Sequence, residues 1–158
     1  MPSPRSAGIL MWKRDGDVLR VLLVHPGGPF WARKDAGAWT IPKGEYQDGE
    51  TPLAAARREF FEELGVDLSA HADGAFVPLG DIRQRAGKTV TAFALEGDLD
   101  ADAIRSNTFE IEWPPKSGKR KSFPEVDRAA WLSLDEAREK INPAQQELLV
   151  RCAALRNL

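Results

Sequence analysis

Three glutamates in the middle of the chain constrain its fold more than any other feature. Apolar residues recur every three or four positions through residues 52–64, and a glycine ends the run, which predicts an amphipathic helix. Glu59, Glu62 and Glu63 therefore share one helical face. Without a cation, each like-charged pair costs about a few tenths of a kcal/mol, and the helix dipole adds to that cost. A divalent cation would offset both penalties, so the spacing predicts either a metal site or a solvated acidic face.

Residues on both sides of these glutamates belong to a longer pattern of charged and glycine positions. In order, its members are Gly44, Glu50, Arg58, Glu59, Glu62, Glu63, Gly65 and Val66. The pattern resembles the Nudix box, a loop–helix–loop motif whose charged and glycine positions are all matched here. Phe60 stands where the box usually has an aliphatic residue, and it remains apolar. A motif with this many fixed positions is specific, so the resemblance favours the metal site.

The resemblance to Nudix proteins implies a role for each residue of the box. The implied ligands of Mg²⁺ or Mn²⁺ are the carboxylates of Glu59, Glu62 and Glu63 and the backbone carbonyl of Gly44. The same three glutamates are the catalytic candidates, and either Glu63 or Glu59 would be the base that takes a proton from a metal-bound water. Glu50 would pair with Arg58 and hold the loop against the helix. A weak, solvated ion pair is the alternative for these two residues.

A fourth carboxylate and a further segment of interest lie outside this run of charged positions. Glu125 stands six residues before Trp131, and residues 39–44 read Trp-Thr-Ile-Pro-Lys-Gly. Both features are similar to the asymmetrical diadenosine tetraphosphate hydrolases of the Nudix superfamily. The resemblance implies that Glu125 is an additional metal ligand or an alternative base, and that Lys43 and Lys88 contact phosphate as point charges. The alternative for each is an ordinary solvated side chain.

Aromatic and basic residues provide further candidates for substrate contacts. Trp31 lies beside Phe30 in a predicted loop, where the two rings either stack on a nucleobase or anchor the loop to the core. Residues 116–121 carry four cations just before Glu125. Such a run is usually solvated, and a flap that grips polyphosphate is the functional alternative. His25 ends an apolar strand and is interpreted as structural.

Hydrophobic periodicity over the rest of the chain predicts a mixed sheet with helices on its faces. The expected strands are 7–13, 18–25, 38–42, 76–85, 88–96, 108–113 and 129–132. The expected helices are 52–64, 135–141 and 143–155, with a helical turn within 98–104 and loops at 26–37, 43–49 and 114–124. No linker divides the chain, so we expect a single domain over residues 1–158. The fold class is therefore α+β, and the Nudix resemblance implies an α/β/α sandwich with a central mixed β-sheet.

Composition narrows the expected partners and location. The chain has 22 basic and 24 acidic residues and a formal net charge of −2, so nucleic acid and anionic membranes are not expected partners. No apolar stretch approaches the length of a membrane span, and no secretory signal is visible. The single cysteine, Cys152, fits a reducing compartment. We expect a cytoplasmic protein with a small phosphoanhydride substrate, and the oligomeric state stays open.

Metal ions held by clustered carboxylates neutralise charge on phosphoryl oxygens and lower the pKa of bound water. The leading interpretation is therefore metal-dependent hydrolysis of a phosphoanhydride bond in a nucleoside diphosphate-linked substrate. A dinucleoside polyphosphate such as diadenosine tetraphosphate is the preferred substrate. The enzymatic alternatives are a modified nucleoside triphosphate and a diphosphoinositol polyphosphate. A Nudix module that senses nucleotides without cleaving them is the alternative from another class, and the intact carboxylates of the box favour an enzyme.

Overall fold

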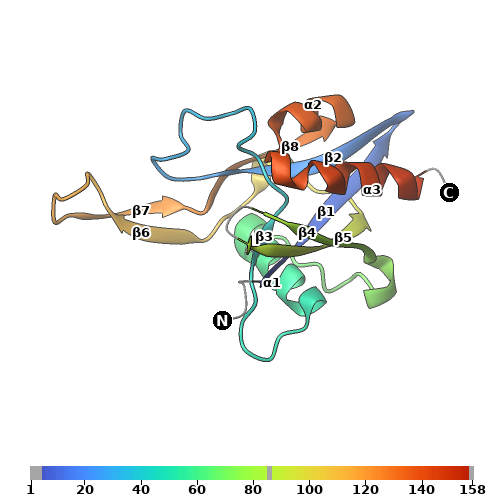
Figure 1. Ribbon diagram of the computed structural model, residues 1–158, viewed down its shortest axis with the longest axis horizontal. Coiled ribbons are helices and arrows are strands. Elements are labelled where there is room, and N and C mark those ends of the chain that lie inside the picture. Colours follow the sequence, from blue (N-terminus) through green and yellow to red (C-terminus); the bar gives the residue numbers. More distant parts are fainter. Residues whose placement is uncertain (1–4, 85–86, 157–158) are drawn as a thin grey trace.

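The computed structural model describes residues 5–84 and 87–156 and arranges them around a six-stranded sheet (Figure 1). The strands of this sheet are β1 (Arg5–Asp15), β2 (Val18–Pro26), β3 (Lys43–Glu45), β4 (Val77–Arg83), β5 (Thr89–Glu96) and β8 (Val126–Ser133). Their order is β4-β5-β1-β2-β8, with β3 paired to the beginning of β1. β1 and β5 run parallel and the other pairs run antiparallel, which confirms the predicted mixed sheet.

Helices cover both faces of the sheet. The longer helices are α1 (Pro52–Leu64), α2 (Leu134–Lys140) and α3 (Gln146–Arg156), and the single turns are η1 (Asp73–Ala75), η3 (Ala101–Ala103) and η4 (Pro143–Gln145). Side chains alternate along β2, so that Leu22 packs with α1 residues such as Phe60, whereas Leu23 packs with Leu148 of α3. The predicted α+β class and α/β/α sandwich are therefore confirmed (Figure 1). Among the described residues, no helix is long and apolar enough to cross a membrane.

The ends of α1 follow from local sequence. The Thr51 side chain accepts a hydrogen bond from the Ala54 N–H at 3.2 Å, and Pro52 occupies the first turn, where its missing N–H costs nothing. Gly65 ends the helix in the left-handed conformation, with φ of 73°, and its N–H donates to the Phe61 carbonyl. The predicted helix 52–64 is confirmed at both ends. Within this helix, the spacing of Glu59, Glu62 and Glu63 places their side chains on one face.

The chain between Ala38 and Glu45 differs from the prediction. A strand was expected over 38–42 and a loop over 43–49, but the strand is β3, and Trp39 and Thr40 form only isolated bridges. β1 and β2 pair next to the turn that joins them, and residues 40–45 lie against the beginning of β1 and the end of β2. Thr40 pairs with Val24 of β2, and β3 then pairs with residues 6–8 of β1. The position of the strand is thus set by its partners, which lie far away in sequence.

A second difference concerns residues 114–124, which were expected to form a loop. Residues 120–124 form β7 (Arg120–Pro124), which pairs with β6 (Thr108–Glu112) in a separate two-stranded sheet. This hairpin projects from the body of the molecule (Figure 1), and we call residues 108–124 the arm. Charged side chains on its exposed strand mask the apolar alternation on which the prediction relied.

The remaining predictions differ from the structure mainly at element ends. β8 extends over 126–133 rather than 129–132, and the last helix begins as η4 before α3. The predicted cap is confirmed, because the Asn142 side chain accepts from the Ala144 N–H at 2.9 Å. The helical turn expected within 98–104 is η3. The turn expected between the strands 76–85 and 88–96 lies partly outside the described residues.

Candidate active site

An acidic cluster forms where α1 meets the chain between β7 and β8. Glu59 and Glu63 come from one face of α1, and Glu125 directly follows β7. One carboxylate oxygen from each lies within 4.8 Å of the others. Glu59 and Glu63 are buried, whereas Glu125 is more open to solvent. Three convergent carboxylates are the donor set that hard divalent cations prefer, so these residues fit a Mg²⁺-type ion.

Burial of the cluster disfavours its charged form. Desolvation raises the pKa of Glu63 to about 9, and the nearby Glu59 carboxylate adds to this shift. Desolvation likewise raises the pKa of Glu59 and of Glu125. Of the three, Glu63 is the carboxylate that holds a proton near neutral pH unless a cation replaces it. A site that stabilises a proton in this way is ready to exchange it for a metal ion.

Gly44 provides the space that the Glu59 carboxylate occupies. A Cβ built on Gly44 would overlap the carboxylate of Glu59, so no larger residue fits without moving that side chain. Gly44 lies in β3, where it pairs with Ala7 of β1. The sheet therefore holds the backbone of the box against the acidic end of α1. This contact explains why a glycine is needed at the first position of the motif.

Arg58 organises the other side of the acidic face. Its guanidinium donates to both carboxylate oxygens of Glu50, at 2.7 and 2.9 Å, and to the backbone carbonyl of Glu45 at 2.9 Å. It also donates to Glu59 at 2.8 Å and to Glu62 at 3.1 Å. This bidentate pairing lowers the pKa of Glu50 and ties the loop to the helix. Of the three glutamates in α1, Glu62 is the one outside the cluster of converging carboxylates, and like Glu59 it lies beside Arg58.

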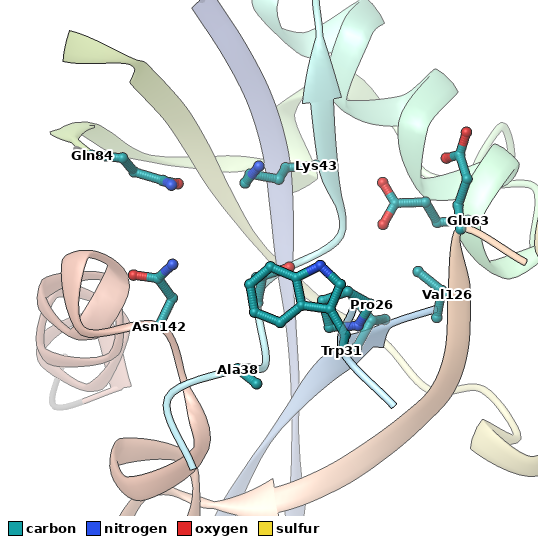
Figure 2. Close-up of a pocket in the computed structure, with 11 residues that line it drawn as sticks. Pro26, Trp31, Ala38, Lys43, Glu63, Gln84, Val126 and Asn142 are labelled. Atoms are coloured by element: carbon teal, nitrogen blue, oxygen red, sulfur yellow. The ribbon is translucent and has the colours of Figure 1, made fainter. Parts of the chain in front are cut away.

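A pocket of about 310 Å³ extends from the acidic cluster. Glu63 and Glu125 line one end of the pocket. Figure 2 shows Gln84 and Asn142 at the opposite end, and Lys43 lies between the two ends. Lys43 is half-buried, and desolvation lowers the pKa of its ammonium group while the nearby Glu63 opposes that shift. The pocket therefore places an acidic end, a cation and an end with two amides in succession.

The other predicted substrate contacts have different surroundings. Trp31 lines the pocket and remains 38% exposed, so its ring is available to a ligand (Figure 2). Lys88 is exposed and does not line the pocket, although its charge acts on Lys43 and lowers the pKa of that residue. Gln84 and Asn142 were not predicted as pocket residues. Asn142 was identified only as a helix cap, and no sequence signal distinguishes Gln84 from a surface glutamine.

His25 is structural, as its position at the end of an apolar strand indicated. Its ring is fully buried, with Nδ1 2.8 Å from an Asp127 carboxylate oxygen and Nε2 2.6 Å from the Lys34 carbonyl oxygen. Both ring nitrogens therefore have a polar partner within the fold. His25 thus connects the loop that carries Trp31 to β8, two residues beyond Glu125. The two sides of the pocket are held together by this contact.

Almost the whole chain matches a known protein family. A model of the NUDIX domain matches residues 2–152. The chain belongs to the NUDIX domain family. The motif over Gly44–Val66 is therefore a Nudix box. It begins in β3, continues through the following loop and includes α1. Nudix proteins generally use divalent metals, and the acidic cluster of Glu59, Glu63 and Glu125 is compatible with this use.

Curated Nudix relatives include proteins of different length. An RNA pyrophosphohydrolase from Bartonella henselae is 34% identical over 144 residues, which cover 85% of this chain and 79% of that protein. A protein named octanoyltransferase from Myxococcus xanthus is 31% identical over 140 residues, which cover 89% of this chain and 34% of that protein. This second relative is much longer, and the chain spans about a third of its length.

Solved structures show the same fold at lower identity. The Ap4A hydrolase of C. elegans, in a binary complex, matches with a TM-score of 0.66 and 20% identity, and the match covers 98% of both chains. At this identity the likeness concerns the fold. The expected Nudix sandwich is thus supported by a neighbour over almost the whole chain.

Proposed function

We propose that this chain is a metal-dependent pyrophosphohydrolase that cleaves a phosphoanhydride bond in a nucleotide. The observation that carries the proposal is the pocket, in which the Glu63 end, Lys43 and the amide end follow one another. The metal and Lys43 would neutralise the negative charge of a polyphosphate at the acidic end. The nucleoside would lie beside Trp31. The relatives named as pyrophosphohydrolases support the same class of reaction.

In this proposal Glu59, Glu63 and Glu125 hold Mg²⁺ or Mn²⁺, and the Gly44 carbonyl is a further candidate ligand. When bound, the ion supplies charge neutralisation and lowers the pKa of a water. The buried Glu63 is the candidate base, because desolvation already raises its affinity for a proton. Glu59 and Glu125 are the alternative bases. Glu62 contributes through Arg58 or through a second ion.

The preferred substrate is a dinucleoside polyphosphate such as diadenosine tetraphosphate. The residues that motivated this preference, Lys43 and Glu125, both line the pocket and so support it. Trp31 lines the same pocket and is partly exposed, so its ring is accessible to a second group of the substrate. We propose that the Trp31 ring stacks on a base and that Lys88, which is exposed, contacts only the outer part of the phosphate chain.

The triphosphorylated 5′ end of an RNA is a second candidate substrate. The observation that favours it is the relationship to RNA pyrophosphohydrolases, one of which matches over 85% of this chain. Its chemistry is the same, because a phosphoanhydride beside a nucleoside is cleaved in both substrates. The two candidates differ in the rest of the molecule. A dinucleoside polyphosphate has a second nucleoside at the other end of its phosphate chain, whereas an RNA continues from its first nucleoside into further nucleotides.

The location and the domain organisation stay proposals as well. We propose a cytoplasmic protein with a single domain over residues 1–158. The presence of one cysteine, Cys152, fits a reducing compartment, and it is fully buried in α3.

A hydrolysis panel with Mg²⁺ and chromatographic identification of products tests the proposal. The substrates are diadenosine tetraphosphate, ADP-ribose, an oxidised deoxynucleoside triphosphate, a diphosphoinositol polyphosphate and a 5′-triphosphorylated RNA. ATP plus AMP from the tetraphosphate is the expected result, and a chelator should abolish it. Turnover of another substrate alone would retain the reaction class and replace the substrate. No turnover of any substrate would favour a nucleotide-sensing module.

A further inference from the structure

The arm is fixed to the active site at its base. Glu125 directly follows β7, and its N–H donates to the Asn107 carbonyl at 2.8 Å, immediately before β6. The Gly27 N–H donates to the Glu125 carbonyl at 2.9 Å, so the loop over residues 26–37 joins at the same point. The arm and this loop are therefore both attached next to the acidic cluster.

Aromatic contacts hold the loop 26–37 against the arm. The Phe30 and Trp113 rings are 5.6 Å apart at 83°, in an edge-to-face contact. The Phe109 ring packs on Gly28, whose φ of 94° requires a glycine and where a Cβ would lie 2.9 Å from the ring. The Phe30 side chain nevertheless remains 62% exposed, and it lies beside Trp31 in the chain. Two adjacent aromatic residues thus stay accessible next to the pocket.

The arm also carries cations that have no carboxylate partner. Lys116, Lys119, Arg120 and Lys121 are all exposed, and in the parts of the chain that the structure describes none of them forms an ion pair. By contrast, Lys13, Arg20 and Arg58 on the sheet and α1 are paired with carboxylates. These four cations outnumber the two glutamates of the arm, although the whole chain has a net charge of −2. Cations outside ion pairs attract a polyanion and release its counterions.

The distance along the arm determines what kind of polyanion can use these cations. Arg120 is five residues before Glu125 on an extended strand, which places its backbone about 16 Å from the acidic cluster at ~3.3 Å per residue. A mononucleotide held in the pocket does not span that distance. A long phosphate-bearing chain does, and accessible aromatic rings beside the cations are the combination that binds single-stranded nucleic acids.

We propose that the arm and the loop 26–37 form a binding surface for a single-stranded polynucleotide whose phosphorylated 5′ end lies at the acidic cluster. The inference rests on the proposed function and deepens its second candidate, an RNA with a phosphorylated 5′ end. The phosphates contact Lys119, Arg120 and Lys121, and a base stacks on Phe30. The overall charge of −2 gives no indication of this surface, because the negative charges lie elsewhere.

Binding to a 5′-monophosphorylated, single-stranded RNA of about twelve nucleotides tests the inference. This probe has no phosphoanhydride bond, so fluorescence anisotropy with Mg²⁺ present measures binding without turnover. We expect Lys119→Gln with Lys121→Gln to weaken binding about tenfold and to lower the slope of log K against log salt by about 1. The charge-matched control is Arg14→Gln with Arg138→Gln, on exposed residues of β1 and α2, which should leave binding unchanged.

A second variant distinguishes a polynucleotide from a plain phosphate chain. Phe30→Leu keeps apolar contact with Trp113 but removes the aromatic face. It should weaken RNA binding about fivefold and leave binding of inorganic polyphosphate unchanged. The inference is overturned if wild-type protein does not bind the RNA, if the arm variant binds like the control, or if polyphosphate binds as tightly as RNA and Phe30→Leu has no effect.

Hydrolysis by the wild-type protein keeps this inference separate from the proposed function. Turnover of diadenosine tetraphosphate without RNA binding overturns the arm surface alone. Arm-dependent RNA binding without turnover of any nucleotide, including the triphosphorylated RNA, overturns the proposed hydrolase and retains the binding surface.

Discussion

The acidic cluster and the arm meet at Glu125, and they differ in burial and in charge. On the α1 side, Glu59 and Glu63 are buried against β3, and their raised pKa values show that the fold holds them at a cost. On the arm side, cations and aromatic rings are exposed and contribute little to the core. A site built from buried charges is sensitive to small changes. A surface of exposed charges acts by the sum of weak contacts, so single substitutions there have small effects.

The largest expected effect is that of Glu63→Gln on turnover. Loss of this buried carboxylate removes a ligand and the candidate base, so kcat should fall at least about 1000-fold, equivalent to ~4 kcal/mol of transition-state stabilisation. Glu62→Gln should cost only about tenfold, because Glu62 lies beside Arg58 outside the cluster. Glu139→Gln, on an exposed position of α2, is the control. Equal losses for Glu62 and Glu63 in steady-state assays would contradict the ligand assignment.

Gly44→Ala should have the next largest effect. The added Cβ displaces the Glu59 carboxylate, so kcat/KM should fall about 100-fold and the apparent affinity for Mg²⁺ should fall with it. Gly74→Ala is a matched control, because a Cβ there meets nothing within 4 Å. The measurement is the activity of both variants as a function of Mg²⁺ concentration. If Gly44→Ala needs no additional Mg²⁺ for full activity, the contact with Glu59 is unimportant.

The stability of the metal-free protein should decrease as the pH rises. The folded protein holds the Glu63 proton up to about pH 9, whereas an unfolded chain releases it near its ordinary pKa of ~4.3. Between these values the folded state binds more protons, so the free energy of unfolding falls with increasing pH. Mg²⁺ replaces the proton, and its stabilising effect should be several degrees larger at about pH 8.5 than at about pH 6 in thermal unfolding. In Glu63→Gln, most of this pH dependence should disappear. A thermal shift independent of pH in the wild type would contradict the prediction.

The smallest effect is expected on the exposed side of the pocket, at Trp31. Trp31→Ala removes a stacking face and should raise KM for a nucleotide substrate about tenfold, with kcat unchanged. Because the ring is 38% exposed, the melting temperature should change little. Trp31→Phe retains an aromatic face and should restore most of the affinity. A fall in kcat or a lower melting temperature for Trp31→Ala would show instead that this ring anchors the loop.

Most of the α1 region was predictable from the sequence because its determinants are local. The cap at Thr51, the stop at Gly65 and the common face of the glutamates depend on neighbours within a few residues. The arm was less predictable. Its strand β7 depends on pairing with β6, and its charged, exposed residues show no apolar alternation. Strand pairing across a hairpin overrode the local preference for a loop.

The sequence by itself determined α1, the Nudix box and the candidate ligands on it, since helix contacts act over three or four residues. Tertiary structure decided which carboxylates converge: Glu125 joins Glu59 and Glu63, whereas Glu62 lies outside this cluster. It also decided that β3, rather than residues 38–42, forms the strand beside the site, and that Gln84 and Asn142 face one pocket. The physical reason is that these contacts join segments tens of residues apart, and only the pairing of the strands brings such segments together.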